Sequence, residues 1–420
     1  MDSPYSGTDK PIKIFWFGDG ACVSTGFGRV ANGILGGLYK TTKYDIIQLG
    51  LNYYGDPHKK PYDIFPARTG DPYGLNRLYE VFRAVNPDVF ITNNDVWAME
   101  WVAKIVTRIR QELDKPIPWI AYFPIDGTPL KISWINFIHN SIDIPIVYTK
   151  WAMEILQSMD PTLKLDYVYH GVDLEVFKKD DSVKEQMKEQ LSDELGRKIN
   201  FVIGYVGRNQ PRKRLPELLL AYKKFVVDKQ DTLLFLHTPV IDEGWHLKNV
   251  IESLQMPKNQ ILTTPGFIVS NPLPDHKLVA LYNLFDVLCL PTVGEGFGLP
   301  LIEGMACGCP IVSTNCSVIP EIVGNCGILV DPDHYQVMPK DNELIRPIPG
   351  VSGMVAAFDS LYHNKGLFNM LSANSLERAK DFGGWSISKW EDIIARAVQI
   401  ISNKQKGSLD FDLGLFEEVT

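Results

Sequence analysis

Short apolar runs alternate with helical stretches along this chain, in two successive series. In the first series the apolar runs lie at residues 13–17, 44–49, 88–92, 117–123 and 145–148. Helical stretches such as 74–85 and 96–113 separate them. Strands that alternate with helices form parallel sheets. The first series therefore predicts an α/β domain that binds its ligand beyond the carboxyl ends of its strands.

A second series begins with the apolar run 201–206 and continues through a helix at 215–227 and a strand at 233–237 to residues 327–330. The two series predict two tandem Rossmann-like domains, over residues 1–180 and 181–385. The boundary lies in the charged stretch 178–198, where the apolar pattern fades.

Two later segments stand outside this alternation. Residues 334–350 are proline-rich and polar, which predicts a surface excursion. Residues 385–401 are helical again. Because they follow the second series, we expect the C-terminal segment 386–420 to cross back to the first domain.

The composition is that of a globular protein. A chain of 420 residues is too long for one ordinary core, and its 45% hydrophobic content can bury two. The net charge of −8 argues against broad binding to nucleic acid, although it leaves a local basic groove open. Apolar stretches are too short to span a membrane, and the first residues lack a secretory signal, so we expect a cytoplasmic location.

The cysteines indicate a reducing environment and no metal site. None stands in a Cys-x-x-Cys pair, and no histidine pair has ligand spacing. Buried thiols are the favoured interpretation and a zinc site the alternative. The six positions are Cys22, Cys289, Cys307, Cys309, Cys316 and Cys326.

Residues 295–303 read Glu-Gly-Phe-Gly-Leu-Pro-Leu-Ile-Glu and directly follow the apolar run 287–290. Gly296 and Gly298 let the backbone approach a ligand closely, and Pro300 suits the first turn of a helix. The start of a helix offers unpaired amides and partial positive charge to an anion. This loop therefore predicts a site for a phosphorylated ligand.

The first strand of the second domain ends in a basic turn that includes Arg208, Arg212, Lys213 and Arg214. Arginine offers a planar fork of donors and lysine a compact charge, so such a turn can neutralise a departing diphosphate. We expect Arg208 and Lys213 to turn inward, whereas Arg212 and Arg214 can remain in solvent. A solvated basic turn is the alternative.

Together these motifs resemble one family. The patterns Arg208-x4-Lys213 and Glu295-x7-Glu303, with Gly171-Val172-Asp173 and a glycine-rich first loop, occur in the order seen in GT-B retaining glycosyltransferases of the family 4 type. Segments 280–287, 305–312 and 320–324 extend the resemblance over nearly the whole second domain. The first domain matches loosely, and its loop 24–30 looks most like that of virus-encoded members.

The resemblance implies a role for each matching position. Arg208 and Lys213 would hold the donor diphosphate, while Glu295 would bind sugar hydroxyls and Glu303 the ribose. The remaining contacts would come from the amides of Gly296, Phe297, Gly298 and Leu299 to the sugar and distal phosphate, from Gly266 and Phe267 to the base, and from Gly26 and Gly28 of the first domain to the phosphates. Plain alternatives are a helix-end carboxylate for Glu295, an exposed carboxylate for Glu303 and a simple turn for Gly26 and Gly28.

One position departs from the family pattern. Many relatives carry a histidine after a first-domain strand, where this chain has Asp126 within the run 119–127. Asp126 would hydrogen-bond a sugar hydroxyl or orient the acceptor, or it would cap the next helix. We expect His170 and His139 to be structural.

The resemblance implies transfer of a sugar from a UDP- or GDP-sugar to a hydroxyl acceptor, with retention and without a metal or other cofactor. A glycosidase is the less suitable interpretation, because it has no use for a diphosphate clamp. A sugar-nucleotide epimerase and a non-catalytic binding protein remain alternatives.

The acceptor stays open among a glycan, a lipid-linked sugar, a protein and a modified base, with nucleic acid considered only as an acceptor and duplex DNA disfavoured by the acidic balance. First-domain aromatic residues can either stack on a sugar or base or pack in the core. They are Tyr53, Tyr54, Tyr62, Tyr73, Trp97 and Trp101.

Overall fold

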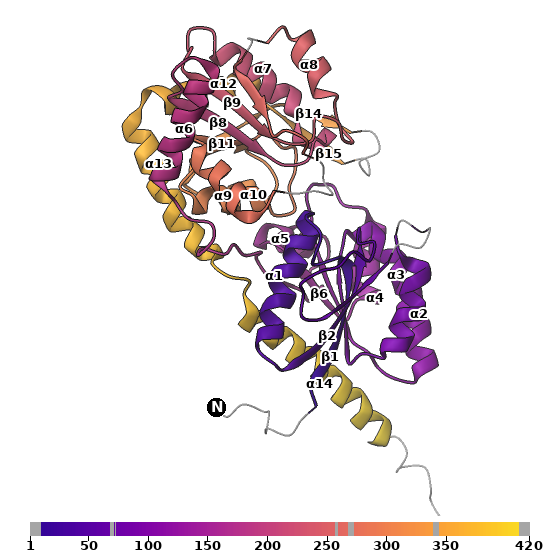
Figure 1. Cartoon of the computed structure of the whole chain (residues 1–420). Coiled ribbons are helices and arrows are strands. Elements are labelled where there is room, and N and C mark those ends of the chain that lie inside the picture. The colour runs from indigo at the N-terminus through magenta and orange to yellow at the C-terminus, as the bar shows by residue number, and fades with distance from the viewer. Residues whose placement is uncertain are drawn as a thin grey trace, which may run out of the picture.

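A computed structural model of the chain describes residues 10–67, 71, 73–256, 259–267, 273–338 and 344–410, with no side-chain description beyond residue 400. Two parallel sheets form two domains, one above the other in Figure 1. The expected fold class, two tandem Rossmann-like α/β domains, is confirmed. Every helix among the described residues is too short or too polar to cross a lipid bilayer.

The first domain contains a seven-stranded sheet in the order β3-β2-β1-β4-β5-β6-β7. All residues of the central strands β4 and β5 are buried, as is typical of parallel strands covered on both faces. The strands are β1 (Ile12–Asp19), β2 (Tyr44–Leu51), β3 (Asp63–Pro66), β4 (Val89–Asn93), β5 (Trp119–Phe123), β6 (Ile144–Val147) and β7 (Asp166–Tyr167). The helices are α1 (Gly26–Lys40), α2 (Leu75–Val85), α3 (Val96–Leu113), α4 (Ile132–Ser141) and α5 (Lys150–Met159).

The second domain contains a six-stranded sheet in the order β10-β9-β8-β11-β12-β13. Its strands are β8 (Phe201–Val206), β9 (Thr232–His237), β10 (Ile261–Thr263), β11 (Val287–Leu290), β12 (Ile311–Thr314) and β13 (Gly327–Val330). Its helices are α6 (Asp181–Leu195), α7 (Leu215–Phe225), α8 (Leu247–Ser253), α9 (Asp275–Leu284), α10 (Leu299–Ala306), α11 (Ile319–Val323), α12 (Val351–His363) and α13 (Lys365–Ala379).

Two segments differ from what their composition suggests. The charged stretch between the two series forms helix α6, which buries none of its residues fully but packs Met187, Leu191 and Leu195 against the core. The expectation of a surface excursion at 334–350 is wrong in its second half. There β14 (Pro332–Val337) and β15 (Ile345–Pro349) form an antiparallel hairpin, in which Arg346 and Ile348 are buried.

The last helix lies along the first domain. Figure 1 shows α14 (Ile387–Asp410, yellow) beside α1. The Trp390 ring lies 6.1 Å from Trp16 and 5.0 Å from Tyr122, measured between ring centroids. The chain therefore closes the core of its first domain with residues from its far end.

The chain segments that enter and leave the second domain run side by side. Val172 donates a backbone hydrogen bond to Phe382 (2.9 Å), and Gly384 donates one to Val172 (3.0 Å). A Cβ on Gly171 would lie 1.3 Å from the carbonyl oxygen of Gly384. Only glycine at position 171 permits this close backbone contact.

Helix α1 provides a matched test of how the returning segment docks. A Cβ on Gly33 would lie 1.9 Å from the Trp385 ring, whereas one on Gly36 would meet nothing within 4 Å. Gly36→Ala should stabilise the protein by about 0.5–1 kcal/mol through helix propensity alone. Gly33→Ala gains the same helix propensity, but it should lower the free energy of unfolding by about 1–3 kcal/mol because the added methyl group overpacks the site. Chemical denaturation measures both, and equal effects would contradict the docking.

Candidate active site

The carboxyl ends of the two sheets meet where the domains touch. Within the second domain, β11 leads into the loop that carries Glu295, and helix α10 follows it. A Cβ on Gly294 would lie 2.1 Å from the carbonyl oxygen of Asp126, and one on Gly296 would lie 2.4 Å from Cβ of Pro124. Both glycines are therefore required by the close approach of the first domain.

The backbone before α10 is shaped for an anion. Gly298 takes the left-handed conformation (φ +91°) at the N-cap, and proline occupies the first turn. The amide of Glu295 donates to Ser317 Oγ (3.2 Å). Among the described residues, the amides of Gly296, Phe297 and Gly298 have no acceptor. They are therefore available, together with the helix dipole, to a negatively charged group.

Glu295 forms the centre of the charged cluster. It is 5% exposed and accepts hydrogen bonds from Lys213 Nζ (2.5 Å) and Arg212 (3.0 Å). Burial raises the pKa of Glu295, but the charges of Lys213 and Arg212 outweigh it and lower that pKa to about 2. Burial lowers the pKa of Lys213 to about 8. At neutral pH the carboxylate is thus firmly ionised.

In the basic turn, Arg212 rather than Arg208 contacts Glu295, which differs from the expectation. Residues Pro211–Lys213 form a 3₁₀ turn, which places Arg212 and Lys213 together against the Glu295 loop. Arg212 also donates to the carbonyl of Gly294 (2.9 Å). The expectation that Arg212 stays in solvent is therefore wrong.

Arg208 and Arg214 have other partners. Arg208 donates to both carboxylate oxygens of Asp242 (3.0 and 2.8 Å) and to Glu243 (2.9 Å), and its side chain is 37% exposed. Its charge still lowers the pKa of Asp19, where burial is the larger and opposite influence. Arg208 therefore lies near the first domain. Arg214 pairs with Glu217 on the next helix.

Glu303 lies one helical turn into α10 and is also contacted from both domains. It is 5% exposed, accepts a hydrogen bond from Tyr282 (2.7 Å) and pairs with Arg29 (3.3 Å) from the first turn of α1. Burial raises the pKa of Glu303. The Arg29 guanidinium also contacts Asp275 (3.2 Å).

The glycine loop of the first domain ends at the start of α1. Thr25 caps this helix by accepting from the Gly28 amide (3.0 Å), and its hydroxyl donates to Asp19. A Cβ on Gly28 would lie 2.4 Å from the carbonyl oxygen of Val23, so this position requires glycine. Gly26 has open space around it.

Asp126 does not cap a helix, because α4 begins after Lys131. Instead Arg346 of the second-domain hairpin holds it. The Arg346 side chain is 1% exposed and donates to the Asp126 carbonyl (2.7 Å) and to its two carboxylate oxygens (3.2 and 3.3 Å). The Ile345 amide adds a bond to Thr128 (3.2 Å). These contacts place Asp126 beside the Glu295 loop, with its side chain 32% exposed.

The motifs did not reveal Asp95, which lies at the N-cap of α3 and makes no capping hydrogen bond. Burial and the nearby charge of Asp126 raise the pKa of Asp95 to about 7, and Arg212 opposes this shift. Asp95, Asp126 and Arg212 therefore share one electrostatic environment. A polar residue just after a buried strand was the only sequence signal for it.

The two histidines considered from sequence lie outside this chemistry. His170 is buried against Tyr122, whose hydroxyl is 2.8 Å from Nδ1, and against the Phe297 ring (4.6 Å). Burial lowers the pKa of His170 to about 3, so it is neutral. His139 pairs with Asp160 on the surface (2.6 Å).

The predicted base-binding segment is only partly described, because residues 268–272 lie outside the described ranges. The Phe267 ring lies 4.3 Å from His237, and Gly266 has φ +63° with open space around it. The exposed backbone at Gly266 leaves room for a planar group.

Comparison with known proteins identifies the second domain. Residues 200–340 match the family model described as "Glycosyl transferases group 1". The O-antigen chain mannosyltransferase B of Escherichia coli is 32% identical over 31% of this chain and 32% of its own length. The MMP alpha-(1->4)-mannosyltransferase of Mycolicibacterium hassiacum is 34% identical over 33% and 32%. The chain thus spans about a third of the length of these curated relatives.

Solved structures match over nearly the whole chain. Sucrose-phosphate synthase from Thermosynechococcus elongatus superposes with a TM-score of 0.71 at 15% identity, covering 93% of this chain and 99% of that one. Anabaena HepE, in complex with UDP and glucose, superposes with a TM-score of 0.66 at 15% identity, covering 92% and 99%. These likenesses establish the fold.

The pairing of Glu295 with Lys213 and Arg212 predicts a pH dependence of stability. Its pKa is lowered from 4.5 to about 2, so on acidification the unfolded chain binds a proton before the folded chain does. This stabilisation is complete above pH 4.5 and is lost as the pH falls toward 2. We expect Glu295→Gln to flatten the dependence of the unfolding free energy between about pH 5 and 3, by up to about 1.4 kcal/mol per pH unit.

Urea denaturation across this pH range measures the slope. Glu154→Gln, which removes an exposed carboxylate paired with Lys150, is the control and should follow the wild type. Equal slopes for Glu295→Gln and the wild type would contradict the strong pairing of Glu295.

The family match covers the basic turn and the Glu295–Glu303 loop, and the structural matches cover both domains. Residues 200–340 match the glycosyl transferases group 1 family model, and the chain as a whole has the two-domain GT-B fold.

Proposed function

We propose that this protein is a retaining glycosyltransferase that moves a sugar from a UDP- or GDP-sugar to a hydroxyl acceptor without a metal ion. One observation carries the proposal. The ionised Glu295, held by Lys213 and Arg212, directly precedes three unpaired amides at the start of α10. Such a site offers positive charge to a diphosphate and an acceptor to sugar hydroxyls, side by side.

The comparisons support the same reaction class. Two of the curated relatives are named mannosyltransferases, and a structural neighbour holds UDP and glucose. By analogy, the donor would lie against α10, with its ribose on Glu303 and its sugar on Glu295. The base would meet the backbone near Gly266 and Phe267.

In the proposed reaction, the bond between the anomeric carbon and the diphosphate oxygen breaks. Negative charge then builds on the departing diphosphate, where Lys213, Arg212 and the amides of Gly296 to Leu299 stabilise it. Arg208 adds its charge from the Asp242 side, and Gly26 and Gly28 of the first domain enclose the phosphates. The domain contacts at Gly294 and Gly296 exclude water that would hydrolyse the donor.

The acceptor would enter on the face from which the diphosphate leaves, and a departing phosphate oxygen would take its proton. This route retains the configuration at the anomeric carbon. Asp126 lies on the first-domain side of the site, where Arg346 fixes its carboxylate. We propose that Asp126 hydrogen-bonds a hydroxyl of the donor sugar or of the acceptor, in the place of the histidine found in many relatives.

The presence of Asp126 in the place of that histidine motivates a second candidate function, a non-catalytic protein that binds sugar nucleotides. Donor hydrolysis separates the two. Release of UDP or GDP from a sugar nucleotide in the absence of acceptor supports the enzyme. Tight donor binding with no hydrolysis and no transfer to a panel of hydroxyl acceptors supports the binding protein.

The two glutamates should separate binding from turnover. Glu303→Gln should weaken binding of UDP or GDP about tenfold, because it loses charge-assisted hydrogen bonds to the ribose. Glu295→Gln should leave binding of the free diphosphate within about threefold, yet lower sugar transfer by about a hundredfold or more. Titration calorimetry measures binding, and chromatography of the released nucleotide measures turnover.

Asp286→Asn is a matched control, because Asp286 is also a buried carboxylate that holds two cations, Lys184 (2.8 Å) and Lys188 (2.6 Å), on other elements. Its loss should affect stability without this split between binding and turnover. If the wild type binds neither nucleotide, the proposed function is wrong. If Glu295→Gln keeps full turnover, the role of Glu295 is wrong.

A further inference from the structure

Three aromatic side chains of the first domain form a cluster at the surface, which we name the aromatic platform: the exposed Tyr73 and Trp101 and the half-buried Trp97. The Tyr73 ring lies 5.7 Å from Trp97 and 4.7 Å from Trp101, and the two tryptophans are 5.8 Å apart. Tyr73 is 40% exposed and Trp101 41% exposed. Single exposed apolar residues are ordinary, but a contiguous group indicates a binding surface.

The platform stands at the same edge of the sheet as the candidate active site. Trp97 and Trp101 lie in the first two turns of α3, which begins just after β4. Asn93, the last residue of β4, pairs with Gly18 near the end of β1 and with Tyr122 of β5, four residues before Asp126. In Figure 1, α3 and α2 flank the first domain below its junction with the second. A chain leaving the active site can therefore reach these rings.

Folding alone does not account for the exposure of Tyr73 and Trp101. Tyr53 and Tyr62, two other aromatic candidates from the sequence, are 6% and 7% exposed and pack in the core. An aromatic ring buries a large area when a partner covers it, so leaving Trp101 partly in water forgoes that stabilisation. A ligand that covers the rings would recover it.

The surroundings of the platform favour a neutral, hydroxyl-rich ligand. Asp95 precedes Trp97 by two residues, and its carboxylate makes no hydrogen bond to the described residues. Burial and the carboxylates of Asp126 and Asp19 raise the pKa of Asp95, and the cation Arg212 opposes them. Carboxylates accept hydrogen bonds from hydroxyls and repel phosphates. The C–H face of a pyranose ring can pack on an aromatic ring, whereas a nucleic acid would bring phosphates to this edge.

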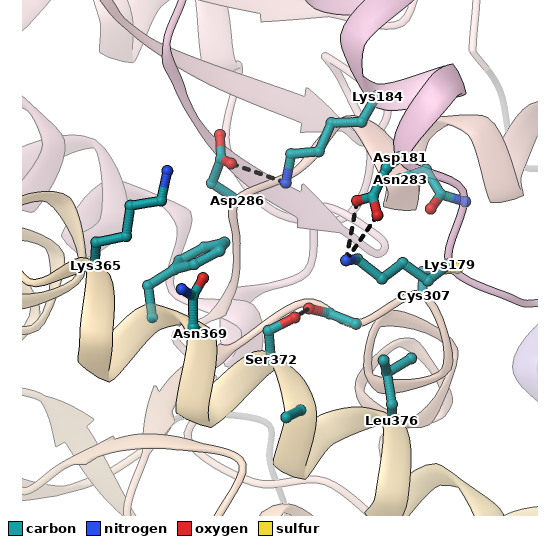
Figure 2. A pocket seen from close by; sticks show the side chains of 13 residues that line it. Lys179, Asp181, Lys184, Asn283, Asp286, Cys307, Lys365, Asn369, Ser372 and Leu376 are labelled. Carbon is teal, nitrogen blue, oxygen red and sulfur yellow. Dashed lines mark hydrogen bonds and ion pairs between the residues drawn. The ribbon is translucent and has the colours of Figure 1, made fainter.

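We propose that the aromatic platform binds the sugar rings of a neutral oligosaccharide acceptor, whose terminal hydroxyl enters the active site past Asp95. The proposal rests on the proposed glycosyltransferase function and names its acceptor class. A polar pocket of the second domain is a separate feature, lined by Lys179, Lys184 and Ser372 in Figure 2. Two of its lysines are already paired, Lys179 with Asp181 and Lys184 with Asp286, so we assign it no ligand.

The test measures binding of mannotetraose and maltotetraose to the full chain by titration calorimetry and tryptophan fluorescence, with UDP or GDP present. Trp101→Ala should weaken oligosaccharide binding about five- to tenfold, and Trp101→Phe should restore most of it. Nucleotide binding should not change. The matched control is Tyr39→Ala, which removes a ring that is 40% exposed. Tyr39 lies in the last turn of α1, at the end of the helix away from the candidate active site.

Binding of either oligosaccharide, weakened by Trp101→Ala but not by Tyr39→Ala, supports the proposal. It is overturned if the wild type binds neither oligosaccharide, if Trp101→Ala binds as well as the wild type, or if an oligothymidylate binds to the platform in preference to the sugars. Failure of UDP and GDP to bind the wild type is a separate result, which counts against the glycosyltransferase function itself.

Discussion

The contact between Arg346 and Asp126 sets the geometry on which the candidate site depends. A fully buried guanidinium from the second domain bonds to the backbone and to the carboxylate of one first-domain residue. Losing the Asp126 carboxylate would remove two hydrogen-bond acceptors from a buried guanidinium at the interface. The same contact brings the Asp126 carbonyl against Gly294, the residue before Glu295. The distance between the two halves of the site is thus fixed beside the residue that we propose holds the donor sugar.

Opposite charges alternate across the interface around this contact. Arg29 of the first domain faces Glu303 of the second, while Arg212 of the second domain lies near Asp95 of the first. Desolvation makes such clusters costly, and replacing buried ion pairs by apolar residues often stabilises a protein. Here these ion pairs fix the relative position of the two domains, because each charge needs its partner from the opposite domain close by. A polar ligand that enters such a site meets dipoles already oriented toward it.

Much of this could be predicted from sequence, because parallel strands and the glycine loops carry local signals. Glu295 and Lys213 were found through short motifs next to recognisable strand ends. Arg346 was not, because its partner lies 220 residues away and its own surroundings are proline-rich, which hid a hairpin. Arg212, and not Arg208, contacts Glu295 because residues Pro211–Lys213 form a 3₁₀ turn. The spacing of residues in the sequence does not predict such a turn.

The return of α14 makes the first domain discontinuous in sequence. Trp390 packs on Trp16 in the core of the first domain. The N-terminal segment leaves the ribosome first, but its core is complete only after nearly all of the second domain has been synthesised. The second domain is in effect an insertion, attached by two chain segments that pair in parallel at Val172 and Gly383 and touch at Gly171 and Gly384. Two such segments resist twisting more than a single tether would. Any opening of the two domains is therefore expected to be a hinge rotation about one axis, which passes through the paired connecting segments.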